Sequence, residues 1–302
     1  MSWIFLALGA ASTLGVVQIL DKLVLFRYVR SPFSLPFWVG LVQSAFGLTL
    51  ILFLPWPETV SFSSIVWGFL SGTCLGLSAV FLLRVLYSQE VSRTIPIFST
   101  FPIFAALIGV FFLNETLSPY HWVAILATVT GAALLSLRQN QKYRHLFLHR
   151  SFFLLMLASL LSAGNYVTSK IALEGLPFLN LYGLHTLATG IVILLPCLRS
   201  APLRECRNLL RQRSPALIIT GLNQWIIGTS ALLLSLWALS LGPVALVSTI
   251  VGTRSFFIVL FSTVITLRFS ASLDEQISPG IVVIKFVATA LIVAGVATIT
   301  LV

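Results

Sequence analysis

The sequence predicts an all-α membrane protein with ten transmembrane helices, arranged as two inverted repeats of five helices each. The first observation is the composition: 58% of the 302 residues are hydrophobic and only 9% are charged. No water-soluble fold buries so large an apolar share, so the solvent of this chain is lipid. The second observation is that the apolar residues form continuous runs of about 20, the length of a membrane-spanning helix, rather than alternating strands.

Ten apolar runs follow one another, separated by short loops. The N-terminus, Met1-Ser2-Trp3, lacks the basic segment and cleavage site of a signal peptide, so we expect the first run to remain a helix. The predicted spans are 3–26, 36–54, 64–87, 94–113, 119–137, 151–171, 178–198, 214–238, 244–267 and 279–300.

Positive charge predicts the orientation of these spans. All but three of the 18 Lys and Arg residues lie in or beside loops that follow odd-numbered helices, the exceptions being Lys170, Arg254 and Lys285. By the positive-inside rule those loops are cytoplasmic, and both termini face outward. The formal charge of +10 is therefore a signature of topology in a bacterial inner membrane, and we expect no nucleic-acid partner.

An internal repeat divides the chain. A shift of 152 positions places Gly76 on Gly228 and Phe104 on Phe256, within similar sequence. Because each half holds five helices, an odd number, the two copies are inverted relative to one another, as in carriers that work by alternating access. The predicted units are a first repeat over 1–140, a basic cytoplasmic linker over 141–150 and a second repeat over 151–302.

Small residues on the third span predict a close helix contact. Gly68, Gly72 and Gly76 are spaced four apart, which clears one helix face for a neighbouring backbone. We interpret this face as a packing surface rather than a ligand contact.

A helical hairpin over residues 94–137 carries a family resemblance. It has Pro102 in its first helix, Leu113-Asn114-Glu115-Thr116-Leu117 at the turn and Gly131 late in its second helix. This pattern resembles the EamA domain of the drug/metabolite transporter superfamily. The resemblance implies a ten-helix carrier with helices one to four and six to nine around a central cavity, and with the fifth and tenth helices outside. Members of the superfamily commonly keep their termini inside, whereas the charges here favour the opposite orientation.

Arg254 is the strongest candidate for a functional residue. It lies about eleven residues into the predicted ninth helix, where insertion of an arginine costs about 2.5–3.5 kcal/mol. No acidic residue occupies the middle of another predicted span, so carbonyls, hydroxyls or an anionic ligand are the expected partners. The alternative is a structural arginine that binds helix carbonyls and clamps two helices together. In the repeat Arg254 replaces Pro102, a departure from the family pattern.

Other polar side chains follow stripes on neighbouring predicted helices. Buried amides and imidazoles require hydrogen bonds, so these stripes are expected to face inward, toward each other or toward a hydrated site. Interhelical contact without any ligand is the alternative. His185 is also the candidate for proton coupling, because an imidazole ordinarily titrates near neutrality. The candidate substrate-binding residues are Arg254, Asn223, Gln224, Trp225, His185, Asn165, Tyr166 and Gln43.

These observations favour a gradient-driven secondary transporter of a small anionic or zwitterionic metabolite, such as an amino acid, a nucleotide-like compound or a phosphorylated compound. A proton or a counter-substrate is the candidate coupling partner, and the bilayer is the other partner. Two alternatives stay open: a flippase for a lipid-linked sugar, and a membrane scaffold that transports nothing. Nucleotide-binding and metalloprotease motifs are absent, and three cysteines give no metal spacing, so we expect neither an enzyme nor a bound cofactor or metal.

Overall fold

The structure is a computed structural model that describes residues 2–28, 34–58, 60–86, 91–136, 149–198, 207, 211, 215–269 and 279–301. Its helices, in chain order, are α1 (Ser2–Tyr28), α2 (Ser34–Phe53), α3 (Phe62–Leu86), α4 (Val91–Phe98), α5 (Phe101–Phe112), α6 (Pro119–Ser136), α7 (His149–Leu173), α8 (Phe178–Cys197), α10 (Pro215–Leu222), the π-helix η1 (Asn223–Gly228), α11 (Thr229–Leu241), α12 (Val244–Gly252), α13 (Arg254–Phe269) and α14 (Pro279–Leu301).

The predicted fold class is confirmed. Among the described residues, seven helices are long and apolar enough to cross a membrane, and three shorter apolar helices accompany them. The predicted spans match these helices to within about one turn at each end. Three of the ten spans are each built from more than one helix: α4 with α5, α10 with η1 and α11, and α12 with α13.

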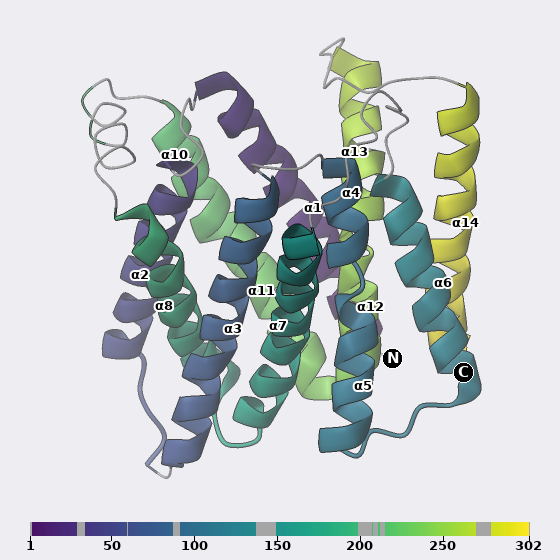
Figure 1. Ribbon diagram of the computed structural model, residues 1–302. Helices are drawn as coiled ribbons and strands as arrows, with labels where there is room; N and C mark the ends of the chain where they lie inside the picture. Colours follow the sequence, from purple (N-terminus) through teal and green to yellow (C-terminus); the bar gives the residue numbers. More distant parts are fainter. Residues whose placement is uncertain are drawn as a thin grey trace.

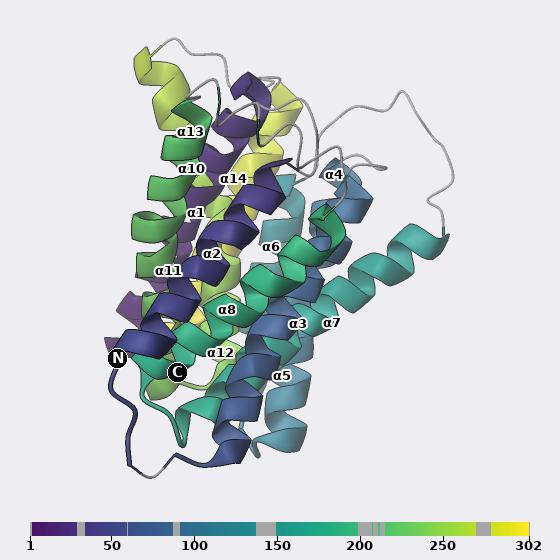
Figure 2. The ribbon, with the colours of Figure 1, turned by 90° about the vertical axis from the view of Figure 1, so that its left-hand side faces the viewer.

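The helices stand side by side as a single bundle (Figure 1). Both views place the N-terminus and the C-terminus at the same end of the bundle (Figure 1, Figure 2). The compartment that this end faces stays a prediction, as does the division into 1–140 and 151–302. The predicted linker at 141–150 lies outside the described residues except for its last two positions.

Reciprocal glycine contacts relate the two halves. A Cβ atom added at Gly40 of α2 would lie 3.0 Å from the carbonyl oxygen of Gly190 in α8, and one at Gly47 would lie 2.8 Å from that of Gly183. The contacts are reciprocal: each helix presents its glycines to those of the other in the same way. This is the pattern of two helices related by a two-fold axis through their crossing point. Missing side chains allow the backbones to approach, which stabilises helix pairs in lipid through van der Waals contact.

The same reciprocity holds for α6 and α14, which pack together along one edge of the bundle (Figure 1). A Cβ at Gly131 would lie 2.7 Å from the oxygen of Ala288, and one at Gly295 would lie 2.8 Å from the oxygen of Ala124. The last helix of each half therefore contacts its counterpart in the other half.

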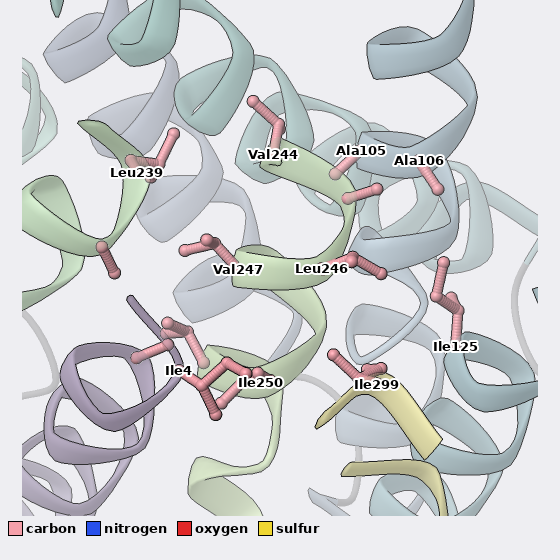
Figure 3. Packing of buried hydrophobic residues seen from close by; sticks show 14 of the residues in the cluster. Ile4, Ala105, Ala106, Ile125, Leu239, Val244, Leu246, Val247, Ile250 and Ile299 are labelled. Carbon is pink, nitrogen blue, oxygen red and sulfur yellow. The ribbon is translucent and has the colours of Figure 1, made fainter. Parts of the chain in front are cut away.

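The main apolar core joins α5 to α12, the short helices contributed by the fourth and the ninth spans. Figure 3 shows Ala105 and Ala106 of α5 beside Leu246 of α12, and all three are buried. Alanine on α5 leaves room for the larger side chains of α12. The two breaks in the spans are thus held against one another by packing.

Candidate functional site

The fourth span breaks at Ser99-Thr100, two residues before Pro102. Proline has no backbone N–H, so the carbonyl four residues earlier, that of Phe98, has no partner within the helix. Ser159 of α7 donates its hydroxyl to this oxygen at 3.2 Å, and lies 3.0 Å from the hydroxyl of Thr100. The sequence predicted one continuous helix here; the proline and a serine from the other half make a stable interruption instead.

The ninth span breaks at Thr253, where α12 ends and α13 begins. The Thr253 hydroxyl donates to the Ile250 carbonyl at 2.7 Å and so replaces part of the interrupted helical bonding. The two breaks touch: a Cβ at Gly252 would lie 3.3 Å from the Cγ atom of Pro102. The amino ends of α5 and α13 are therefore brought together inside the bundle.

Arg254 is the first residue of α13, and not an interior residue of a continuous ninth helix as predicted. Its guanidinium carbon lies 5.8 Å from the ring centroid of Phe98 and 5.9 Å from that of Phe101. Aromatic faces attract cations by about 0.5–2 kcal/mol, so they stabilise the guanidinium without neutralising its charge.

Tyr166 of α7 completes the surroundings of Arg254. Its ring stacks on Phe101 with centroids 5.8 Å apart and planes 9° apart, and it lies within electrostatic range of Arg254. Its hydroxyl lies close to Ser235 of α11. The structure thus brings together two predicted site residues, Arg254 and Tyr166, from the fourth and the first spans of the second half.

His185 and Asn165, two further predicted residues, meet between α8 and α7. The Nε2 atom of His185 lies 2.8 Å from Oδ1 of Asn165, and the histidine side chain is only 1% exposed. Its other ring nitrogen, Nδ1, and the nearby hydroxyl of Ser169 are buried without a hydrogen-bond partner. Buried polar atoms of this kind are sites where a water or ligand is expected.

Asn223 and Gln224 begin the π-helical turn η1 in the eighth span. The backbone N–H of Thr229 bonds the carbonyl of Gln224, five residues back, so this turn holds more residues than an α-helical turn. Both amides consequently reach α1. Nδ2 of Asn223 donates to Oδ1 of Asp21 at 2.8 Å and to the Val17 carbonyl at 3.1 Å, and Nε2 of Gln224 lies 3.4 Å from Oδ2 of Asp21.

Gln43 and Trp225 extend this group toward α2. Nε2 of Gln43 lies 3.4 Å from Oε1 of Gln224. The Trp225 ring lies 6.0 Å from that of Phe46 and is 52% exposed, so one of its faces is open rather than packed.

The predicted residues therefore form three groups: Arg254 with Tyr166, His185 with Asn165, and Asn223 with Gln224, Gln43 and Trp225. Neighbouring positions on α7 join the first two groups, because Asn165 and Tyr166 are adjacent. Tyr182 links the second and third groups. It lies one turn before His185, its hydroxyl donates to Thr229 at 2.9 Å, and the Thr229 hydroxyl in turn donates to the Gln224 carbonyl at 3.3 Å. No described hydrogen bond or ring contact joins all three groups directly.

Asp21 is the residue that sequence reasoning missed. It falls near the end of the predicted first span, beside Lys22, where a charged residue does not stand out as a candidate. In the structure α1 continues to Tyr28, which places Asp21 well inside the helix and against η1. A usable signal was present: the neighbouring polar residue Gln18 is three positions earlier, so both lie on one helix face.

Metal binding has no support in the described part of the chain, where no group of three or more His, Cys, Asp and Glu side chains is placed to hold an ion.

Comparisons with known proteins agree with this architecture. Residues 1–137 match the model of the EamA-like transporter family. A solved structure described as "Crystal structure of protein" is similar to this chain with a TM-score of 0.65 at 17% sequence identity, over 99% of this chain and 95% of its own. No curated protein sequence matches.

The fold and its apolar helices define a multi-pass α-helical membrane protein. The family match confirms the resemblance seen in the sequence: residues 1–137, slightly less than half of the chain, match the EamA-like transporter family, a domain of the drug/metabolite transporter superfamily. This family consists of transporters rather than enzymes.

Proposed function

We propose that this protein is a gradient-driven secondary transporter of a small anionic or zwitterionic metabolite, which it moves by alternating access with Arg254 as the anchor for the anionic group. The observation that carries the proposal is the meeting of the amino ends of α5 and α13 beside this arginine.

The electrostatics of that meeting point favour an anion. Each helix carries the equivalent of about half a positive charge at its amino end, together with backbone N–H groups that have no helical partner. Arg254 adds a full positive charge at the end of α13, where the helix dipole opposes it. An anion at this position interacts favourably with all three charges at once, as is typical of broken helices in carriers.

The three polar groups support a site that extends across the bundle. One group supplies a cation and a hydroxyl, from Arg254 and Tyr166. A second group supplies the amides of Asn223, Gln224 and Gln43, and the third is the pair His185 and Asn165. We propose that these side chains line the substrate path, and that a proton or a counter-substrate couples transport.

Unequal packing of equivalent helices supports alternating access. On α3, a Cβ at Gly72 would overlap the His185 carbonyl and one at Gly76 would lie 2.7 Å from Val192 Cβ, so α3 and α8 are closely packed. The repeat places Gln224 at the position of Gly72, and there the eighth span meets α2 through side chains, with much less extensive contact. A protein closed at one helix pair and looser at its counterpart is in one of the two states that rocking requires.

Transport by the purified protein in proteoliposomes tests the proposal. Labelled amino acids, nucleotides and phosphorylated metabolites are offered against proton and counter-substrate gradients, after a thermal-shift screen of the same compounds has selected binders. We expect saturable flux of a solute with an anionic group. Arg254→Ala is expected to reduce this flux at least tenfold, and Arg254→Lys to retain part of it, because the charge persists without the planar fork.

Two outcomes would overturn the proposal. Undiminished flux of anionic solutes in Arg254→Ala removes the arginine from the site. Movement of a lipid-linked sugar alone, or of no solute at all with an intact fold, favours the flippase or the scaffold instead.

A further inference from the structure

The group around Asp21 has the character of a cation-binding site and lies apart from Arg254. An ionised Asp21 receives hydrogen bonds from Asn223 and Gln224, both neutral amides. Neutral donors solvate a carboxylate but leave its negative charge in place. Asp21 is partly buried within the bundle, where a negative charge is costly unless a positive partner accompanies it.

Two carbonyl oxygens of the same group are unused. The Oδ1 atom of Asn223, whose side chain is 1% exposed, and the Oε1 atom of Gln43 are both buried and have no hydrogen-bond partner. The amide nitrogen of Asn223 already donates to Asp21, and that of Gln43 to Gln224. Each side chain can therefore still accept hydrogen bonds through its carbonyl oxygen. The site therefore requires N–H or O–H donors.

Aromatic rings border these acceptors. Phe46 lies one turn after Gln43 on α2, and its ring centroid is 6.0 Å from those of both Trp225 and Tyr182. The open face of Trp225 is available to an apolar stem or to a cation.

We infer that Asp21, Asn223 and Gln43, with Phe46 and Trp225 as an aromatic wall, bind a primary ammonium group of the transported solute. A primary ammonium carries one positive charge and three N–H donors on an apolar stem, which matches one carboxylate, two free carbonyl oxygens and an aromatic border. This inference rests on the proposed function and narrows it: the solute is zwitterionic, with its anionic group at Arg254.

Thermal stabilisation of the purified full-length protein by methylammonium chloride tests the site without knowledge of the solute. Methylammonium is expected to raise the melting temperature in a saturable manner. Tetramethylammonium, which has no N–H donor, and sodium chloride at equal ionic strength are expected to leave it unchanged. Equal stabilisation by all three salts overturns the inference.

Two variants localise the effect. Asp21→Asn is expected to abolish the methylammonium response, and Gln43→Leu to weaken binding about tenfold or more through loss of one charge-assisted hydrogen bond. Glu58→Gln is the matched control, because Glu58 is an exposed carboxylate outside the spans. If Asp21→Asn does not fold, Gln43→Leu decides alone. A response unchanged in the folded variants overturns the inference.

Flux measurements separate this inference from the proposed function. In proteoliposomes, Asp21→Asn is expected to reduce flux of a zwitterionic solute at least tenfold while leaving its deaminated anion unaffected. Equal loss for both solutes, or for neither, rejects the ammonium site while anion transport through Arg254 stands. Methylammonium binding that depends on Asp21, without flux of any solute, rejects the transport function while the site stands.

Discussion

Ser159 shows how a single hydroxyl maintains a broken helix in lipid. The carbonyl of Phe98 lacks its helical partner because of Pro102, and no water is available inside a bilayer to replace it. Ser159 supplies the missing donor from the other half of the molecule. The interruption of the fourth span therefore depends on a side chain that lies far away in the sequence.

Ser159→Ala is expected to lower the free energy of unfolding by about 1–3 kcal/mol, because it leaves a buried carbonyl without a donor. Thermal unfolding in detergent measures the change. Ser240→Ala is the control: its hydroxyl is exposed and bonds the carbonyl of Trp237 in its own helix. Similar losses in the two variants would show that Phe98 finds another partner.

The turn between α11 and α12 is held by two side chains of opposite charge. An acidic side chain binds the start of α12, and a basic side chain binds the end of α11. Glu115, from the turn of the first hairpin, accepts hydrogen bonds from the N–H groups of Val244 at 2.5 Å and Ala245 at 3.2 Å. Lys170 of α7 donates to the carbonyls of Leu239 at 2.6 Å and Gly242 at 3.0 Å. An anion at the amino end and a cation at the carboxyl end both complement the helix dipoles.

Glu115→Gln is expected to reduce stability by about 1 kcal/mol, because it removes the charge and one of two acceptors at the start of α12. Chemical denaturation in detergent monitors the loss, with Glu58→Gln as the exposed control. A change no larger than that of the control would show that backbone contacts alone hold this helix end.

The α3–α8 contact gives a prediction for a whole helix pair. Gly72→Ala places a methyl group against the backbone of His185, so it is expected to push the helices apart, lower the melting temperature by several degrees and reduce transport. Gly221→Ala is the matched control, since nothing lies within 4 Å of the added methyl group. Alanine favours the helix there by about 1 kcal/mol, so no loss is expected. Equal effects of the two substitutions would contradict a close α3–α8 contact.

At the scale of the whole molecule, the number and position of spans follow from the sequence because the bilayer fixes the length of each apolar run. Three local departures from continuous α-helices were not predicted, and they have a different origin. These are the breaks near Pro102 and Thr253 and the π-turn at Asn223. They depend on which backbone groups find hydrogen-bond partners across the bundle, and the apolar pattern of the sequence does not identify those partners.

The candidate site, too, could be predicted from the sequence only in part. Arg254, His185 and the amides were recognisable because each is costly in lipid, so its presence requires a reason. Asp21 was missed because a carboxylate near a span end is ordinarily at the membrane surface. Only the position of η1 shows that this one faces the interior.

Topology reporters test the orientation predicted from charge. Alkaline phosphatase, which is active only outside the cytoplasm, is expected to be active when fused after Val302 and inactive when inserted at 141–150. Green fluorescent protein at the same positions is expected to show the opposite pattern. Reversal of both patterns would place the termini inside, as is common in the superfamily.

The location of both chain ends at one end of the bundle also determines how copies can be linked. Two copies can be joined, the last residue of one to the first of the next, by a flexible tether that never crosses the bilayer. Such a concatemer would allow a single protomer to be altered while its neighbour stays intact. Each protomer's contribution to solute movement can then be counted without an additional membrane anchor.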